Sequence, residues 1–252
     1  MTLVGRAALV TGGSSGIGAA IAEELARNGA SVTLSYFRNE TGARAVAERI
    51  ERLGQAALAV RADVRFKSEV VTLFRRHFDR FKSLDILVNN AGDMGKRVPT
   101  NETPEELWHD VINLNLSSVF FCCQEALSPM IGQSRGRIIN ISSVGARTGG
   151  GPGAIPYHAA KAGVIALTRG LAKEVARHRI TVNAIAPGII ETSFHERHTD
   201  PTQRAEWIRS LIPLQRSGQP EEVAKLVAFI ASEDAEYITG ATMDINGGMA
   251  MY

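Results

Sequence analysis

The sequence predicts an α/β fold in which helices cover both faces of a doubly wound, parallel β-sheet. Three observations predict it. Short runs of β-forming residues alternate with longer helical stretches along the 252-residue chain. Most of these short runs are apolar almost throughout, as expected for strands that crossover helices cover on both faces. A glycine-rich turn follows the first run and opens the first helical stretch, an arrangement typical of such sheets.

About seven strands are expected, within a single domain that spans residues 1–252. The candidate strands are Ala7–Val10, Ser31–Ser35, Ala57–Val60, Asp85–Asn89, Arg137–Ile141, Ile180–Ala184 and Ala241–Ile245. Helix signals stand between them: Gly29 and Gly54 lie where helices should end, and Pro104 and Pro220 each precede two glutamates at a helix start. No repeat, proline-rich linker or charge block divides the chain.

Two segments interrupt this alternation. Residues 145–156 contain five glycines and two prolines, and residues 192–213 are also irregular. Both are expected to be loops or short mobile helices. Because both follow predicted strands, they belong at the edge of the sheet where ligands bind. The second segment predicts a substrate lid at about residues 190–213.

Composition and charge exclude several classes of protein. The 28 basic and 26 acidic residues leave a net charge of +2 and form no basic run, so nucleic acid is not expected as a partner. The two cysteines, Cys122 and Cys123, are adjacent, which favours free thiols in a reducing compartment over a disulfide framework or zinc site. No run of eighteen apolar residues occurs and the chain begins without a long apolar segment. A cytoplasmic protein without a membrane span is expected.

The glycine-rich turn runs from Thr11 to Gly18 and is followed by a helical run. Its glycines permit a tight turn, close approach of backbone amides to a pyrophosphate, and close contact between helix and strand. The positions of Gly12, Gly16 and Gly18 differ from the commonest dinucleotide fingerprint, G-x-G-x-x-G, and indicate a particular branch of dinucleotide-binding proteins.

Five motifs in this order resemble the short-chain dehydrogenase/reductase family across nearly the whole chain. They are the T-G-x-x-x-G-x-G turn at Thr11–Gly18, the N-N-A-G segment at Asn89–Gly92, Asn115 within Asn113–Leu116, Ser143 with the Y-x-x-x-K pair Tyr157 and Lys161, and Pro187-Gly188 after the sixth strand. The resemblance implies a Rossmann-type sheet, hydride transfer between a nicotinamide cofactor and a carbonyl or secondary alcohol, and a homotetramer.

The resemblance also implies the site residues. The implied catalytic residues are Asn115, Ser143, Tyr157 and Lys161. The expected cofactor-binding residues are Gly12, Ser14, Ser15, Gly16, Ile17, Gly18, Tyr36, Arg38, Asp63, Val64, Asn90, Ala91, Gly92, Tyr157, Lys161, Pro187, Gly188, Ile190 and Thr192. By the same resemblance, Lys161 holds the nicotinamide ribose, Asn115 anchors a proton-relay water, and Asp63 bonds the adenine amino group.

Spacing supports the role of the tyrosine. Tyr157 and Lys161 are four residues apart and should share one helical face, with an ammonium beside a phenol. Lowering the pKa of a tyrosine from about 10 toward 7 requires about 4 kcal/mol. A positive charge about 4 Å from the phenolate oxygen would stabilise it by a comparable free energy at an effective dielectric constant of about 20. Ser143, rather than Ser142, is expected to bond the substrate oxygen, because Ser142 should be buried at the strand end and bonded to backbone.

The second strand predicts the cofactor. It ends in Ser35-Tyr36-Phe37-Arg38, without the carboxylate that binds the ribose 2′-hydroxyl of NAD. Arg38 could instead pair with a 2′-phosphate, so NADP(H) is favoured and NAD(H) remains possible. Ser15 weakens the argument, since some NADPH-specific relatives carry arginine there.

The histidines carry weaker expectations. His158 should point away from the face of Tyr157 and Lys161 and act as a neighbouring contact, not a proton carrier. His195 and His198, in the lid segment, could contact substrate, but exposure to solvent is the favoured interpretation. The six histidines show no metal-ligand spacing, so no metal is expected.

Three functions remain open: a reductase of 3-oxoacyl or other carbonyl substrates, a sugar or polyol dehydrogenase, and a non-catalytic dinucleotide sensor. Basic residues where carrier-protein reductases dock their acidic partner are Arg135, Arg137, Arg177 and Arg179. The two most directly aligned positions are Ser134 and His178, which weakens the carrier-protein hypothesis. Retention of all four catalytic residues argues against a sensor.

Two helical stretches predict the oligomer from the residues themselves. Val111–Ala126 and Ala159–Val175 are apolar or small almost all the way round, so each has a second face that one sheet does not cover. Packing of these helices against their copies about a two-fold axis would bury both faces. The alternative is that the lid or residues 249–252 cover the second face within one subunit.

Overall fold

A parallel β-sheet forms the centre of the computed structural model, which describes residues 2–251 except for the side chains of His195 and Glu196. Within this range the seven strands are β1 Ala7–Val10, β2 Ser31–Tyr36, β3 Ala57–Arg61, β4 Ile86–Asn89, β5 Gly136–Ile141, β6 Ile180–Pro187 and β7 Thr242–Ile245. Their spatial order is β3-β2-β1-β4-β5-β6-β7, and every pair is parallel. The predicted fold class is confirmed.

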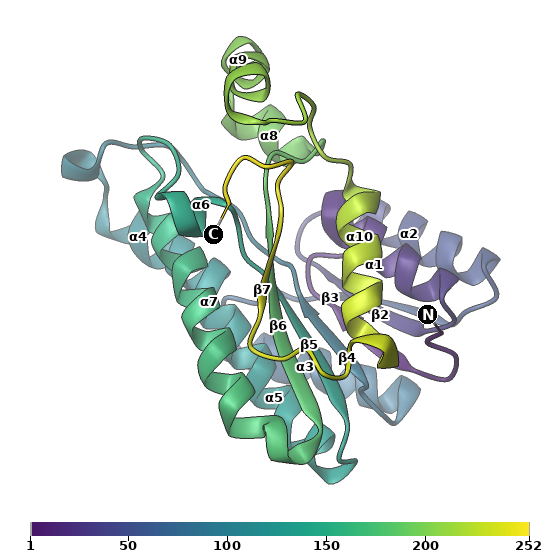
Figure 1. Cartoon of the computed structure of the whole chain (residues 1–252). Helices are drawn as coiled ribbons and strands as arrows, with labels where there is room; N and C mark the ends of the chain where they lie inside the picture. Colours follow the sequence, from purple (N-terminus) through teal and green to yellow (C-terminus); the bar gives the residue numbers. More distant parts are fainter. Residues whose placement is uncertain (1, 252) are drawn as a thin grey trace.

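Helices cover both faces of this sheet (Figure 1). They are α1 Gly16–Arg27, α2 Glu40–Arg52, α3 Lys67–Phe81, α4 Glu105–Ile112, α5 Ser118–Gly132, α6 Gly145–Thr148, α7 Ile155–Val175, α8 Ser193–His198, α9 Pro201–Leu211 and α10 Pro220–Ala231. Side chains of α1, α2 and α10 form one hydrophobic core with the sheet, and those of α3, α5 and α7 form the other.

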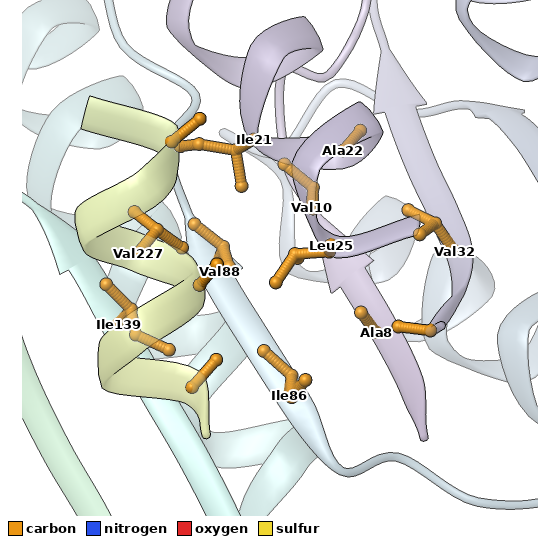
Figure 2. Close-up of a cluster of buried hydrophobic side chains, with 14 of the residues drawn as sticks. Ala8, Val10, Ile21, Ala22, Leu25, Val32, Ile86, Val88, Ile139 and Val227 are labelled. Carbon is orange, nitrogen blue, oxygen red and sulfur yellow. The ribbon is translucent and has the colours of Figure 1, made fainter. Parts of the chain in front are cut away.

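Alternating strand residues supply the two cores. Ala8 and Val10 of β1 pack toward α1 and α10, whereas Leu9 between them packs into the opposite core. Figure 2 shows the first core, in which Leu25 of α1 and Val227 of α10 lie against the strand side chains. Because each side chain in such a strand enters an apolar layer, the strand sequence is apolar throughout, which is the pattern that predicted the fold.

The strand order reverses between β1 and β4, and the loops that leave the carboxyl ends of these strands diverge there. Such a switch point creates a crevice at the carboxyl edge of an open α/β sheet. The segments after β5 and β6 leave the same edge, and α8 and α9 stand beyond it (Figure 1). The fold therefore brings together four loops that are distant in the sequence.

The structure differs from the predicted boundaries in two places of consequence. β6 runs three residues beyond Ala184, to Pro187, because it pairs with both β5 and β7. The helix expected over Val111–Ala126 is divided by a π-helical turn, Asn113–Ser117. Such turns widen a helix locally and are frequent at functional sites.

The two irregular segments contain short helices. Residues 145–156 contain α6, a loop and the first two residues of α7, and residues 192–213 contain α8 and α9. Among the described residues, no helix combines the length and the apolar character needed to cross a membrane.

Candidate active site

A cavity of about 1110 Å³ opens at the carboxyl edge of the sheet. Its lining comes from the segments after β1, β2, β3, β4, β5 and β6, together with α7, α8 and α9. All of the predicted catalytic residues except Asn115, and all of the predicted cofactor-binding residues, line it. Asn115 lies directly behind the cavity wall, as described below.

The glycine-rich turn packs tightly against the loop after β4. A Cβ atom on Gly18 would lie 2.2 Å from the carbonyl oxygen of Gly12, so only glycine allows α1 to begin this close to β1. The side-chain amide of Asn90 donates to the carbonyl oxygens of Thr11, at 3.0 Å, and Gly12, at 3.2 Å. Thr11 Oγ1 in turn accepts from the backbone N–H groups of Asn90 and Ala91, each at 3.0 Å. Asn90 thus braces the turn.

Basic and aromatic side chains mark the end of β2. The guanidinium groups of Arg38, Arg61 and Arg65 lie 5.2, 5.4 and 5.7 Å from the centre of the Phe37 ring. Arg61 was missed from the sequence, although it ends β3 and stands opposite Tyr36 in the sheet register. Pairing the end of the second predicted strand with the end of the third would have identified Arg61, because residues opposite one another on neighbouring strands lie side by side.

Asp63 forms a close pair with Arg65. The Nη2 atom of Arg65 donates to Asp63 Oδ2 at 2.7 Å, and Nε donates to Oδ1 at 3.0 Å. Burial opposes ionisation of the carboxyl group, but the hydrogen bonds from Arg65 outweigh it and lower the pKa of Asp63. Asp63 therefore lines the cavity as an ionised carboxylate that is hydrogen-bonded to Arg65.

Tyr157 lies near the start of α7 with its side chain buried. Ser143, which follows β5, is close enough to the phenol for a hydrogen-bonding interaction that lowers its pKa. Burial raises the pKa of Tyr157 to about 12, because removal from water penalises the phenolate more than the Ser143 hydroxyl stabilises it. Ser142 is buried as predicted, and its hydroxyl donates to the Lys161 carbonyl oxygen at 2.8 Å.

Lys161 lies on the same face of α7, but its amine does not lower the pKa of the tyrosine as the spacing predicted. Its Nζ atom lies 5.7 Å from the centre of the Tyr157 ring and donates to the Ile141 carbonyl oxygen at 2.9 Å. Burial lowers the pKa of Lys161 to about 8, so the charge that was expected to act on the phenol is itself penalised. In this arrangement desolvation dominates the pKa values of both groups.

The π-helical turn places Asn115 beside Lys161. The side-chain amide of Asn115 donates to the carbonyl oxygens of Asp93, at 2.7 Å, and Val111, at 2.9 Å. Its Oδ1 atom is buried and has no hydrogen-bond partner among the described residues. A Cβ atom on Gly92 would lie 2.6 Å from that Oδ1 and 3.2 Å from Lys161 Nζ, so glycine keeps open the space between the two.

The loop after β6 lines the cavity and reaches the glycine-rich turn. Pro187, Gly188, Ile190 and Thr192 all line it, and Thr192 Cγ2 would lie 3.2 Å from a Cβ atom on Gly16. The loop after β6 therefore approaches the glycine-rich turn at the start of α1.

Two expectations about single residues are wrong. The side chain of His198 is only 10% exposed, because its Nε2 atom contacts the Asp93 carboxylate at 3.0 Å. Arg137 is buried and its guanidinium donates to the carbonyl oxygens of Gly136 and Ser232, so it cannot bind a partner at the surface. The side chain of His195 lies outside the described residues.

His158 is also buried. Its ring centre lies 5.3 Å from that of Tyr157, and neither of its ring nitrogens has a hydrogen-bond partner among the described residues. Burial, followed by the charge of Arg97, lowers its pKa and favours the neutral ring.

The strand order, the braced glycine-rich turn and the crevice define a nucleotide-binding α/β protein of the Rossmann type. A family model described as enoyl-(acyl carrier protein) reductase matches residues 12–250. The 3-oxoacyl-(acyl-carrier-protein) reductase of Synechocystis is 45% identical over 251 residues, with 99% of each chain covered.

Solved structures agree with these matches. Levodione reductase superposes with a TM-score of 0.94 at 35% identity, covering 99% of both chains. A short-chain dehydrogenase from Burkholderia cenocepacia, determined in complex with NADP, has a TM-score of 0.91 at 35% identity and the same coverage. The chain belongs to the short-chain dehydrogenase/reductase family and is an oxidoreductase.

Proposed function

We propose that this protein is an NADP(H)-dependent reductase that interconverts a carbonyl group and a secondary alcohol, with 3-oxoacyl thioesters or related carbonyl compounds as substrates. One observation carries the proposal: Tyr157, Ser143 and Lys161 meet in the same cavity as the glycine-rich turn. The name of the Synechocystis relative supports the substrate class, and the NADP complex of the Burkholderia dehydrogenase supports the cofactor.

The residues present fit a nicotinamide dinucleotide. The start of α1 offers backbone N–H groups to a pyrophosphate, in a turn that a Cβ atom on Gly18 would obstruct. At the end of β2 no carboxylate is available for a ribose 2′-hydroxyl, whereas Arg38 and Arg61 have no ion-pair partner among the described side chains. Of these two cations, Arg38 lines the cavity and favours the 2′-phosphate of NADP. When bound, the nicotinamide supplies or accepts the hydride.

In the direction of carbonyl reduction, Tyr157 donates its hydroxyl proton to the carbonyl oxygen as negative charge develops there. A phenol whose pKa is about 12 remains protonated at neutral pH and is ready to donate. The Ser143 hydroxyl donates a second hydrogen bond to the same oxygen. Oxidation of the alcohol reverses these steps: Tyr157, as the phenolate, accepts the hydroxyl proton of the alcohol.

Asn115 and Lys161 line a space in which a hydrogen-bonded group could relay protons to Tyr157. The unpartnered Oδ1 atom of Asn115 and the amine of Lys161 face the space that Gly92 leaves open. A buried acceptor without a partner is unfavourable, so this space suits a hydrogen-bonding water or ligand hydroxyl. Such a group would connect Tyr157 and Lys161 to solvent protons.

The segment 190–213 is proposed as the substrate lid within a single-domain chain. Phe194 of α8 lies 5.9 Å from the Tyr157 ring, measured between ring centres, and Trp207 and Leu211 of α9 also line the cavity. These side chains enclose the space into which a substrate chain would extend. They make the substrate end of the cavity largely apolar.

A cytoplasmic homotetramer is proposed as the working form. In the single chain, the face of α7 formed by Ala159, Ala162, Ala166 and Gly170 is exposed, and so is half of the Phe120 side chain on α5. The lid and the described C-terminal residues leave this face uncovered, which favours its burial against a second copy. The buried free thiols of Cys122 and Cys123 suit a reducing compartment.

The decisive experiment compares the wild-type protein with Tyr157→Phe on ketones, 3-oxoacyl thioesters, sugars and polyols, with both nicotinamide cofactors. The wild type should turn over carbonyl compounds with NADPH, and Tyr157→Phe should lose about 10²- to 10⁴-fold while binding cofactor within a few-fold. Near-normal turnover by the variant would exclude the tyrosine mechanism. Turnover confined to sugars or polyols would instead favour the alternative dehydrogenase.

A further inference from the structure

Arg97 lies in the wall of the cavity, between the glycine-rich segment that follows β5 and the helix α8. Its Nη1 atom donates to the Pro152 carbonyl oxygen at 2.9 Å, and its Nε atom donates to the His198 carbonyl oxygen at 3.1 Å. Both partners are uncharged, and no acidic side chain pairs with Arg97 among the described residues. Burial lowers the pKa of Arg97, as expected for a cation whose lost hydration no anion replaces.

The surrounding backbone holds the guanidinium at this position. Val98 N–H donates to the Gly153 carbonyl oxygen at 2.9 Å, which fastens the chain after Arg97 to the glycine-rich segment. A Cβ atom on Gly151 would lie 3.5 Å from Arg97 Nη1, so this glycine lies directly beside the guanidinium. Two of the five N–H groups of the guanidinium are engaged, and the other three remain for a ligand.

The neighbouring charged groups do not neutralise Arg97. The carboxylate of Asp93 is occupied by His198 and by Arg197, whose Nη2 atom lies 3.1 Å away. His158 is neutral, and its pKa is depressed in part by the charge of Arg97 itself. Among the described side chains, no free carboxylate therefore balances the positive charge of Arg97 at this end of the cavity.

Apolar side chains form the rest of this end. The Arg97 guanidinium lies 6.0 Å from the Trp207 ring centre, and Met94, Leu107, Phe194 and Leu211 line the adjacent walls. A guanidinium in such surroundings binds a carboxylate or phosphate more strongly than it would in water, and can do so through two parallel hydrogen bonds. An apolar chain between the anion and the reacting carbon would contact the walls.

We propose that Arg97 binds an anionic group of the substrate, a carboxylate or a phosphate, and thereby selects acidic carbonyl compounds over neutral ones of the same length. This inference rests on the proposed carbonyl reductase activity and specifies the substrate class for that site. Arg97 acts on substrate binding and leaves the proton transfer to Tyr157.

The test uses matched substrates that differ only in charge. Oxo acids of increasing chain length are compared with their methyl esters, and the 3-oxobutanoyl thioester of 4′-phosphopantetheine is compared with that of N-acetylcysteamine. Each is assayed with the wild type, Arg97→Gln, Arg97→Lys and Lys96→Gln. Lys96 is the matched control, because it is the exposed neighbouring cation and does not line the cavity.

The wild type should favour one charged substrate over its neutral partner by about ten- to a hundredfold in kcat/KM, mainly through KM. Arg97→Gln should remove that preference while leaving the neutral substrates within about twofold, Arg97→Lys should retain part of it, and Lys96→Gln should retain it all. A preference for the oxo acid identifies a carboxylate, and a preference for the phosphopantetheine thioester identifies a phosphate. Equal losses on charged and neutral substrates, or no wild-type preference, would overturn the proposal.

A binding measurement separates this inference from the proposed activity. The chain has two tryptophans, so Trp108→Phe leaves Trp207 as the only indole, next to Arg97. Titration with the oxo acid should change the Trp207 fluorescence, and the change should need at least tenfold more ligand in the Arg97→Gln variant. If nothing is turned over but this difference persists, only the proposed activity fails. If the fluorescence responds equally in both proteins, Arg97 is not the anion site.

Discussion

Replacement of Lys161 by methionine should stabilise the protein without bound cofactor even as it removes the proposed catalytic amine. Burial lowers the pKa of this amine from 10.5 to about 8. Because one pKa unit corresponds to about 1.4 kcal/mol, the protonated amine opposes folding by about 3 kcal/mol at neutral pH. Loss of the hydrogen bond to the Ile141 carbonyl oxygen destabilises the variant by about 1 kcal/mol, which offsets part of this gain. The expected net gain in the free energy of unfolding is therefore about 2 kcal/mol.

The pH dependence follows from the direction of the shift. Below pH about 8 the amine of Lys161 is protonated in both the folded and unfolded states, so the whole penalty is present. Between about 8 and 10.5 the folded state is neutral while the unfolded state still binds the proton, so the wild type gains stability as the pH rises. The advantage of Lys161→Met should accordingly be full at pH 7 and nearly absent at pH 10.

Urea unfolding of wild type and Lys161→Met at equal protein concentration measures the stability gain and its pH dependence. The midpoint and slope of each curve give the free energy of unfolding at that pH. Lys173→Met is the matched control: this lysine is exposed on the same helix, and its replacement should change stability by less than about 0.5 kcal/mol. A Lys161→Met variant that is less stable than the wild type at pH 7, or whose advantage is unchanged at pH 10, would refute the reasoning.

Three other predictions can be checked with standard assays. Ser143→Ala should reduce turnover far more than Ser142→Ala, because only Ser143 bonds the phenol; the reverse order in steady-state kinetics would mean that the serine is misassigned. Arg38→Ala should weaken NADPH binding by about ten- to a hundredfold and leave NADH unchanged in a fluorescence titration, since it removes a charge-assisted bond to the 2′-phosphate; equal losses for both would contradict this role. Light scattering should give about four times the 27.1 kDa chain mass, whereas a monodisperse monomer at micromolar concentration would exclude the oligomer.

Most of the fold was predictable because its determinants are local. Strands such as β1 are apolar on consecutive residues, and helices begin and end at glycine and proline positions that the chain itself displays. The boundaries that were missed depend on partners. β6 extends to Pro187 because β7 pairs with its end, and the π-helical turn at Asn115 accompanies side-chain bonds to Asp93 and Val111.

The candidate site divides in the same way. The sequence by itself determined which chemical groups are available: the turn at Thr11–Gly18, and Tyr157 and Lys161 one helical turn apart. It could not determine their electrostatics, because burial by distant segments raises the pKa of the phenol and lowers that of the amine.

Only the tertiary structure decided which distant residues share an environment. Arg97 meets the carbonyl oxygen of His198, 101 residues away, and Arg61 stands beside Arg38 through the register of two strands. No local spacing encodes such contacts, since they depend on how helices and strands pack after the chain has folded. Motifs and periodicity are properties of neighbouring residues, whereas desolvation and charge balance are properties of the whole packed molecule.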